Sequence, residues 1–231
     1  MKKCLAILAM LVITTVTGYP QPKIRKSVFG ANAGIALPVD QFAGNTFIRD
    51  AGFALAGPAT EADWIWHGKF FGFSSTIGYS TFFFNEMDYL SEYDRVLSGI
   101  GTNIAATGNY HVIKFLIGFT LKTPEFRSTE ILLRFHVGAA TSFHPEVTVT
   151  NTELGVVNSI VQSRSGGPAS SAILQVNHWL SDRYGLSLSS SISSTIGAFH
   201  DETGPEGYFL LPVHFVNINL GFVMNLKAPR Q

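Results

Sequence analysis

The chain has 231 residues, which is enough for one all-β domain of ordinary size. Its 16 Lys and Arg residues balance 16 Asp and Glu residues, so net charge gives no attraction to nucleic acid. Charged residues make up only 14% of the chain while Phe alone supplies 19 residues, and this composition argues against a surface that faces only water.

The first 18 residues are predicted to be a signal peptide. Lys2 and Lys3 form a short basic region, residues 5–16 are an apolar run, and Gly18 offers a small residue before the expected cleavage point. The run is shorter than the roughly 20 apolar residues that a membrane-spanning helix needs. The chain is therefore expected to be exported, and removal of the signal peptide would also remove Cys4, its only cysteine.

The rest of the chain reads as a linker, 19–26, followed by one domain, 27–231. That domain contains eight extended segments, and the second of them is weaker because Gly57 and Pro58 interrupt it. In chain order the segments are 27–37, 51–64, 70–84, 108–121, 130–143, 169–180, 186–199 and 210–226.

The segment 186–199 shows the pattern most clearly, because apolar and hydroxyl residues alternate along it. Leu186, Leu188 and Ile192 fall on one face, and Ser187 and Ser191 fall on the other. Successive strand residues point to opposite faces, so this strand has one apolar side and one uncharged polar side. That combination is typical of a membrane barrel with lipid outside and a narrow polar lumen inside.

The connections between the segments alternate in length. The long ones are 38–50, 85–107, 144–168 and 200–209, and the short ones are 65–69, 122–129 and 181–184. Membrane barrels show this asymmetry, with long loops outside the cell and tight turns in the periplasm. The sequence therefore predicts an all-β fold, an eight-stranded antiparallel transmembrane β-barrel preceded by a signal peptide.

The first and last segments resemble those of the small outer-membrane β-barrel family, of the eight-stranded OmpA/OmpX-like or porin-like type. The matching stretches are Phe29 to Pro38 at the entry and Phe215 to Leu226 at the close. One departure is the tail from Lys227 to Gln231, where many members of the family end on an aromatic residue. The resemblance, closest to barrels of the Bacteroidota type, implies the outer membrane of a Gram-negative bacterium, contact with outer-membrane lipid, and a monomer.

Alternation alone leaves open which face points outward, since a soluble lipocalin-like barrel would bury the apolar face instead. The polar faces favour the membrane barrel because Ser, Gly, Asn and Thr dominate them, and water-facing strands would carry more charge. Aromatic residues near segment ends, Trp64, Trp66, Phe71 and Phe83, suit the boundary between lipid and water.

Five residues are candidates for a polar network in the lumen. Lys114, Arg134 and His136 lie on the inward faces of the fourth and fifth segments. Glu61 and Asp63 join them if the register of the second segment shifts at Pro58. An eight-stranded barrel is just wide enough for side chains to fill it, so we expect a polar plug, with a narrow solute path as the alternative.

Ser142, His144 and Glu146 offer the ingredients of an activated nucleophile at the end of the fifth segment. Pro145 interrupts the strand between the last two of them, and no oxyanion donor can be named. We therefore expect no enzymatic activity. The remaining His residues are scattered without a metal-binding spacing, so no metal or cofactor is expected.

The external loops are the remaining candidate site. The 85–107 loop carries acidic and Tyr residues, and the 144–168 loop alternates Val with polar residues. The second pattern indicates a hairpin above the membrane, and an exposed hairpin edge can recruit a partner strand. The expected role is structural or surface interaction through these loops, with a porin-like channel or a lipid hydrolase as alternatives.

Overall fold

The computed structural model describes residues 26–47, 51–97, 100–124, 126, 128–200 and 208–226. The predicted signal peptide (1–18) and all of the predicted linker (19–26) except its last residue lie outside the described residues. A search of the described residues finds no helix with the length and apolar character needed to cross a membrane.

Most of the described residues lie in β-strands. In chain order the elements are β1 (Ser27–Val39), the 3₁₀ helix η1 (Asp40–Ala43), β2 (Ala54–Leu55), β3 (Gly57–His67), β4 (Phe71–Phe84), α2 (Glu86–Leu97), β5 (Asn103–Thr107), β6 (Tyr110–Lys122), β7 (Thr129–His144), β8 (Val147–Asn151), β9 (Gly155–Ile160), β10 (Ser163–Trp179), β11 (Tyr184–His200) and β12 (Tyr208–Asn225).

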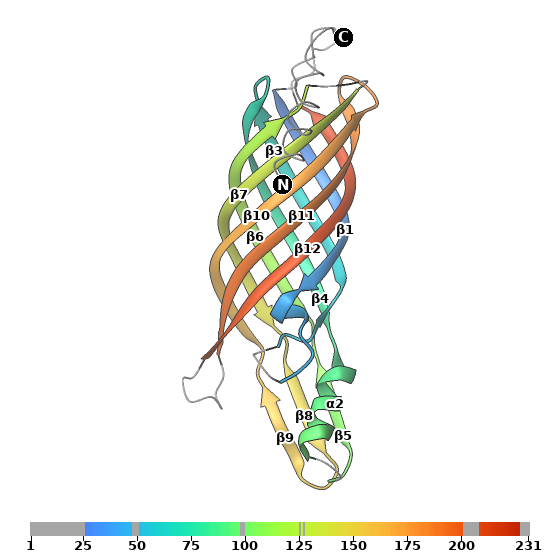
Figure 1. The fold of residues 1–231 in the computed structure, drawn as a ribbon, viewed down its shortest axis with the longest axis vertical. Helices are drawn as coiled ribbons and strands as arrows, with labels where there is room; N and C mark the ends of the chain where they lie inside the picture. The colour runs from blue at the N-terminus through green and yellow to red at the C-terminus, as the bar shows by residue number, and fades with distance from the viewer. Residues whose placement is uncertain are drawn as a thin grey trace, which may run out of the picture.

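Eight of these strands form a closed antiparallel barrel, as predicted. They pair in the order β4-β3-β1-β12-β11-β10-β7-β6, and the pairing of β4 with β6 closes the ring. Figure 1 shows the strands tilted strongly around the common axis. Closure satisfies the backbone hydrogen bonds of the wall within the chain, which a structure surrounded by lipid requires.

Most strand boundaries follow the predicted segments to within about three residues, and β3, for example, runs to His67 where the second segment was expected to end at 64; two differences are larger in kind. The second segment is split into β2 and β3 at Ala56, where Leu55 and Ala56 are both exposed and the alternation shifts by one residue. The sixth segment begins at Ser163, earlier than predicted. The sequence pattern missed this start because small residues such as Gly166 and Gly167 give little difference in hydrophobicity between the two faces of the strand.

The apolar side of each barrel strand faces outward and the polar side faces inward. Phe73 and Phe115 are 52% and 58% exposed, whereas their sequence neighbours Ser74 and Lys114 are buried. A belt of exposed aromatic and aliphatic side chains around a polar interior is the reverse of the arrangement in a soluble barrel, where the apolar side chains are buried. The predicted sidedness is therefore confirmed, and the belt faces hydrocarbon.

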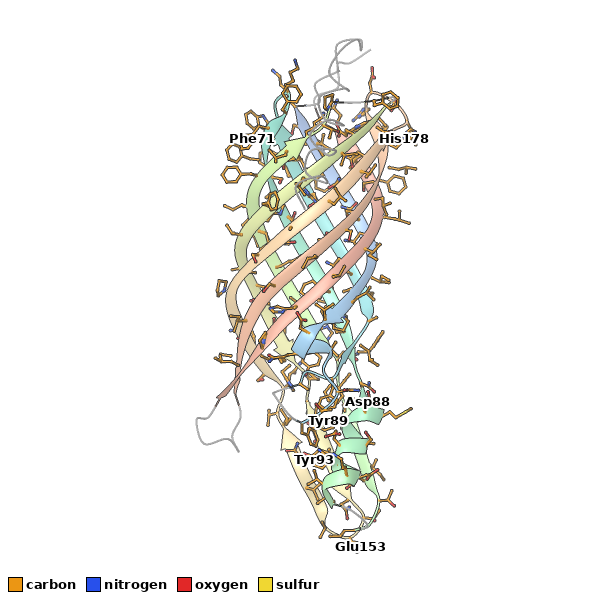
Figure 2. All side chains as sticks on the ribbon, viewed as in Figure 1. Phe71, Asp88, Tyr89, Tyr93, Glu153 and His178 are labelled. Carbon is orange, nitrogen blue, oxygen red and sulfur yellow. The ribbon has the colours of Figure 1, made fainter. Side chains whose placement is uncertain are left out.

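Aromatic side chains gather on the outer surface near the end of the barrel that carries the short turns. Rings from β3, β4 and β6 contact one another there, with centroids 5.3 to 6.5 Å apart, in the set Trp66, Phe71, Phe73 and Phe119. Figure 2 labels Phe71 at this end. Amphipathic and aromatic rings favour the level of the lipid headgroups, so this cluster marks one edge of the membrane.

The other end, which we call the long-loop end, carries a projecting extension made of α2, β5, β8 and β9 (Figure 1). The three strands form a separate sheet in the order β5-β8-β9. The 144–168 loop forms the predicted hairpin, β8 and β9, while α2 and β5 come from the 85–107 loop.

Candidate functional site

All five predicted lumen residues lie inside the barrel. Glu61 and Asp63 are on β3, Lys114 is on β6, and Arg134 and His136 are on β7. Each is more than nine-tenths buried. The shift of alternation at Ala56 turns both β3 carboxylates inward, slightly earlier in the chain than the sequence placed it.

Lys114 and Glu61 form an ion pair across an intervening strand. The Lys114 Nζ lies 2.7 Å from Glu61 Oε1, although β6 and β3 are separated by β4. Gly78 of β4 is the residue between them in register, and a Cβ built there would lie 2.7 Å from Lys114 Cε. The absence of a side chain at Gly78 therefore lets the two charged groups meet.

A glycine on the intervening strand also allows His136 to reach Ser74. His136 Nε2 lies 2.6 Å from Ser74 Oγ, and the residue between them in register, on β6, is Gly118. A Cβ at Gly118 would lie 2.8 Å from His136 Cδ2. Glycine in the lumen thus serves polar pairing across a neighbouring strand.

Asp63, like Glu61, is held by three side chains of the network. Its Oδ1 accepts from Arg134 Nη1 at 2.8 Å and from Thr76 Oγ1, and its Oδ2 accepts from Asn32 Nδ2 at 2.8 Å. Removing charges from water is costly, and good geometry with added hydrogen bonds offsets that cost. The Asp63 oxygens are satisfied in this way, whereas the completely buried Arg134 is paired through Nη1 alone, and its Nε and Nη2 have no hydrogen-bond partner among the described residues.

Sequence reasoning missed a third buried ion pair, Lys122 with Glu130. Their Nζ and Oε2 atoms are 2.5 Å apart, and Asn177 Nδ2 donates to Glu130 Oε1 at 3.0 Å. Lys122 lies just beyond the predicted fourth segment and Glu130 opens the fifth, so the pair sat at uncertain strand ends. Extending the alternation from Thr120 and Arg134 would have placed both inward. The three ion pairs together balance three cations against three carboxylates.

Small hydroxyl residues of β11 line the wall opposite these charges. The inward residues are Ser187, Ser189, Ser191, Ser193 and Thr195, all of them buried. Their size leaves room for long side chains that reach across the lumen, and Lys114 Nζ donates to Ser193 Oγ at 3.0 Å. The uncharged polar face of this strand, which stood out in the sequence, therefore contributes hydrogen-bond partners to the lumen network.

Apolar side chains fill both ends of the lumen. Near the short-turn end they are Val28, Ile65, Leu132, Trp179 and Val223. At the long-loop end, η1 inserts Phe42 between Phe82 and Tyr110, with ring centroids 4.9 and 5.1 Å away, and Phe215 packs on Phe82. The charged middle thus lies between two apolar layers, an arrangement suited to a plug.

Ser142 and His144 both point inward from β7, while Glu146 is exposed beyond Pro145. His144 Nδ1 lies 2.8 Å from the Pro145 carbonyl oxygen and Nε2 lies 3.2 Å from the Tyr110 hydroxyl. The imidazole is thus directed at neighbours other than the serine. In the described part of the chain, no group of three or more His, Cys, Asp or Glu residues could hold a metal ion.

The extension is an ordered platform in which α2 packs on the three-stranded sheet. Tyr89 of α2 is buried, and its ring centroid lies 5.0 Å from that of Phe53 and 5.2 Å from that of Phe47. Asn158 of β9 donates to the Tyr89 hydroxyl at 3.0 Å, and Asn103 of β5 donates to Asp94 at 2.7 Å. Figure 2 shows Tyr89 and Tyr93 turned into the extension and Glu153 at its far tip.

Burial raises the pKa of Tyr89 above its usual value, and burial likewise raises the pKa of Tyr93. On the exposed side of α2, the hydrogen bond from Arg95 lowers the pKa of Glu92, whose carboxylate also accepts from the Phe47 backbone N–H. The buried Tyr89 side chain thus holds α2 against the sheet, and the Glu92 carboxylate holds α2 to the loop after β1.

Comparison with known proteins gives matches among solved structures alone: no family model and no curated protein matches the chain. Ail, the attachment invasion locus protein of Yersinia pestis, is 10% identical with a TM-score of 0.47, over 86% of this chain and 99% of that one. A major outer membrane protein from Thermus thermophilus is 11% identical with a TM-score of 0.48, over 86% and 98%. Neisserial surface protein A is 7% identical with a TM-score of 0.46, over 87% and 97%.

These superpositions fall below a TM-score of 0.5, so the fold assignment rests on the strand pairing and the sidedness of the wall. A closed ring of eight antiparallel strands, an apolar exterior and a charged interior are the features of a small outer-membrane β-barrel. The narrower Bacteroidota type stays a prediction.

Proposed function

We propose that this outer-membrane barrel is a surface-interaction protein that acts through its extension and has no catalytic role. The observation that carries the proposal is the contrast between the filled lumen of the barrel and the ordered extension at its long-loop end. The lumen is filled with paired charges and capped by apolar side chains, while the long-loop end carries an ordered platform beyond the membrane. In this proposal the barrel anchors the protein in the membrane and the extension provides the interaction surface.

The proposal places the long-loop end outside the cell, in the outer membrane of a Gram-negative bacterium. Short turns on the periplasmic side and long loops outside are the rule for such barrels. The apolar belt supplies the lipid contact and leaves no need for a second subunit, so we propose a monomer. The extension would then meet other cells, surfaces or extracellular proteins.

The order of the extension favours interaction over a solvated loop. Disordered loops must be fixed at the moment of binding, and that ordering weakens affinity. Here α2 is held through Tyr89, Asp94 and Glu92 to three different parts of the chain. A surface fixed before contact can bind without that loss.

The test removes the extension and leaves the barrel. Residues 86–107 and 146–162 are each replaced by a short Asn-Gly turn, and a matched control replaces the turn 181–183 at the other end in the same way. Cells displaying each chain are assayed for adherence to beads coated with serum proteins, and heat-modifiability on a gel reports the folded barrel. We expect adherence to fall to background only in the trimmed chain. Equal adherence of the trimmed and intact chains would refute the proposal.

A narrow channel is the second candidate, favoured by the charged and hydroxylated middle of the lumen. Planar-bilayer recordings separate the two roles, because the apolar layers around Phe42 and Trp179 should block ions. We expect no conductance steps from the intact chain. Regular steps would support the channel, and changed lipid composition that depends on Ser142 would support the lipid hydrolase.

A further inference from the structure

We propose that the barrel cross-links itself inside the lumen, by an amide bond between the side chains of Lys114 on β6 and Asn217 on β12, with Glu61 on β3 as the catalytic residue. The reaction modifies this chain once and has no external substrate, so the proposal is independent of the surface-interaction role above. It rests on an amine and a carboxamide that meet at one buried carboxylate oxygen.

The amine of Lys114 and the carboxamide of Asn217 both contact Oε1 of Glu61. Lys114 Nζ lies 2.7 Å from this oxygen, and Asn217 Nδ2 donates to it at 2.9 Å. The missing side chain of Gly78 leaves the space through which Lys114 reaches the carboxylate. An amine, a carboxamide and a carboxyl group held together are the two reactants and the acid–base catalyst of transamidation, in which an amine displaces ammonia from an amide.

The reaction begins when one proton passes from Nζ to Oε1 within the ion pair. Lys114, Glu61 and Asn217 are 2%, 4% and 0% exposed, so bulk water does not reach the pair. The transfer turns two buried charges into an uncharged amine and a carboxylic acid, and it removes the desolvation cost that two buried charges carry. A desolvated lysine amine without its extra proton is a nucleophile.

Asn217 supplies the acceptor that the new carboxylic acid needs. Its Oδ1 is buried and has no hydrogen-bond partner among the described residues. A half-turn of the carboxamide exchanges the places of Nδ2 and Oδ1, so that Oδ1 accepts the acid proton of Glu61. This hydrogen bond polarises the carbonyl group and opens Cγ to attack. Ser193 Oγ, 3.0 Å from Nζ, accepts a proton of the amine and holds it in position.

The bonds and protons balance within these three side chains. The Nζ–Cγ bond forms and the Cγ–Nδ2 bond breaks. As Nζ attacks, Glu61 gives its proton to Oδ1 and takes one from Nζ. As the carbonyl re-forms, Glu61 gives a proton to the departing Nδ2 and recovers the one on Oδ1. The products are a secondary amide and one molecule of ammonia, and Glu61 ends as the acid that it was before the attack.

The surroundings suit a bond that forms once and lasts. A cavity of about 10 Å³ borders Lys114, Ser193 and Phe215, and this is close to the space that one water-sized molecule needs, so ammonia has room to leave. The Phe215 ring, with its centroid 5.3 Å from Nζ, and the apolar layers at both ends of the lumen keep out water that could hydrolyse the amide. Because each chain reacts once, a rate far below that of an enzyme suffices.

A neighbouring residue, Asn219, fits the reaction less well. Its Nδ2 donates at 3.1 Å to Oε2 of Glu61, the carboxylate oxygen opposite the one that Lys114 contacts. Asn217 shares the very oxygen that receives the lysine proton. Proximity to the amine therefore favours Asn217 as the acyl donor.

The short-turn end of the lumen repeats the same three residue types in Lys122, Glu130 and Asn177. Lys122 Nζ lies 2.5 Å from Glu130 Oε2, and Asn177 Nδ2 donates to Glu130 Oε1 at 3.0 Å. In this set, however, Asn177 Oδ1 already accepts from Gln175 Nε2 at 2.7 Å, which fixes the amide with its nitrogen toward the carboxylate. The second set therefore serves as a matched control for the first.

The test compares the mass of the full chain before and after folding. The chain is produced as unfolded aggregates, dissolved in urea and refolded into detergent micelles, and heat-modifiability on a gel confirms the folded barrel. We expect the folded chain to lose the mass of one ammonia molecule relative to the urea sample. Proteolytic digestion should then give a branched peptide that joins Lys114 to Asn217.

Two variants and one control identify the reacting groups. Asn217→Leu keeps the ion pair of Lys114 and Glu61 but should show neither the mass loss nor the branched peptide. Asn177→Leu, the same change in the second set, should show both. Glu61→Gln should slow bond formation by about a hundredfold or more, because general acid–base catalysis contributes about 10²–10⁴-fold.

The proposal is overturned by a folded chain of unchanged mass, and by any product that uses other atoms. Loss of one water molecule with a link from Lys114 to Glu61 would make the carboxylate the acyl donor. Loss of ammonia in an unbranched peptide would mean that Asn217 has cyclised onto its own backbone. A link to Asn219 or Asn177 in place of Asn217, or equal rates in Glu61→Gln and the parent chain, would also refute it. None of these results bears on adherence, so the proposed function is tested separately.

Discussion

Removing the carboxylate of Asp63 should destabilise the barrel far more than removing the whole ion pair. Asp63→Ala leaves the Arg134 guanidinium completely buried without its carboxylate partner and also deprives Asn32 and Thr76 of their acceptor. Breaking a buried pair on one side costs about 3–5 kcal/mol. The double variant Asp63→Leu, Arg134→Met replaces the pair with apolar groups of similar size, which is often close to neutral.

The measurement is urea unfolding of the barrel in lipid vesicles, followed by the fluorescence of Trp64, Trp66 and Trp179. With a denaturant slope of about 2 kcal/mol per molar, a loss of about 4 kcal/mol lowers the midpoint by about 2 M. Thr60→Ala, on the outer side of β3, is the matched control and should shift the midpoint little. The reasoning is refuted if Asp63→Ala unfolds within about 0.5 M of the parent chain, or if the double variant is the weaker of the two.

Three other substitutions test the lumen packing and the lipid face. Gly78→Val should push Lys114 away from Glu61 and cost about 1–3 kcal/mol in the same unfolding assay, and an unchanged midpoint would contradict the role given to that glycine. Phe42→Ala should remove the centre of the aromatic layer at the long-loop end and cost about 3–5 kcal/mol, which differential scanning calorimetry can check. Phe115→Lys should cost about 2–4 kcal/mol in vesicles, because it places a charge on the hydrocarbon-facing surface; full stability there would argue that this face is not in lipid.

The barrel could be predicted from the sequence because its two environments differ so sharply. Lipid outside and paired polar groups inside force a two-residue alternation, and that alternation survives in Leu186 to Phe199 without any help from loops. Where the two faces of a strand differ little in hydrophobicity, its boundaries were predicted less accurately. Gly166 and Gly167 hid the start of β10, and the split at Ala56 was foreseen only as a condition on Glu61 and Asp63.

The extension was harder to predict because its order comes from contacts between distant segments. Residues 86–97 were expected to be loop and instead form α2, whose Tyr89 packs on Phe53 and bonds to Asn158. The spacing of Tyr89, Tyr93 and Leu97 fits one side of a helix and was the available local signal. The β8–β9 hairpin was foreseen from its alternating Val residues, but its pairing with β5 was not, since nothing local specifies that register.

The shared register of wall and extension has a mechanical consequence. If β8 and β9 belonged to a separate module, a hinge at Pro145 and Gln162 would let the extension swing, and its surface would be set only at the moment of contact. The pairs on either side of those residues, His144 with Ser163 and Val147 with Ile160, instead keep one register, so bending there must distort a ladder that continues into the membrane. The buried charges work to the same end, since the pairs of Glu61 and Asp63 tie β3 to β6 and β7 across the lumen. Rigidity of the filled barrel is thereby carried into the extension, which is why Asp63→Ala should loosen the β9 amides in hydrogen exchange even though Asp63 and β9 share no contact.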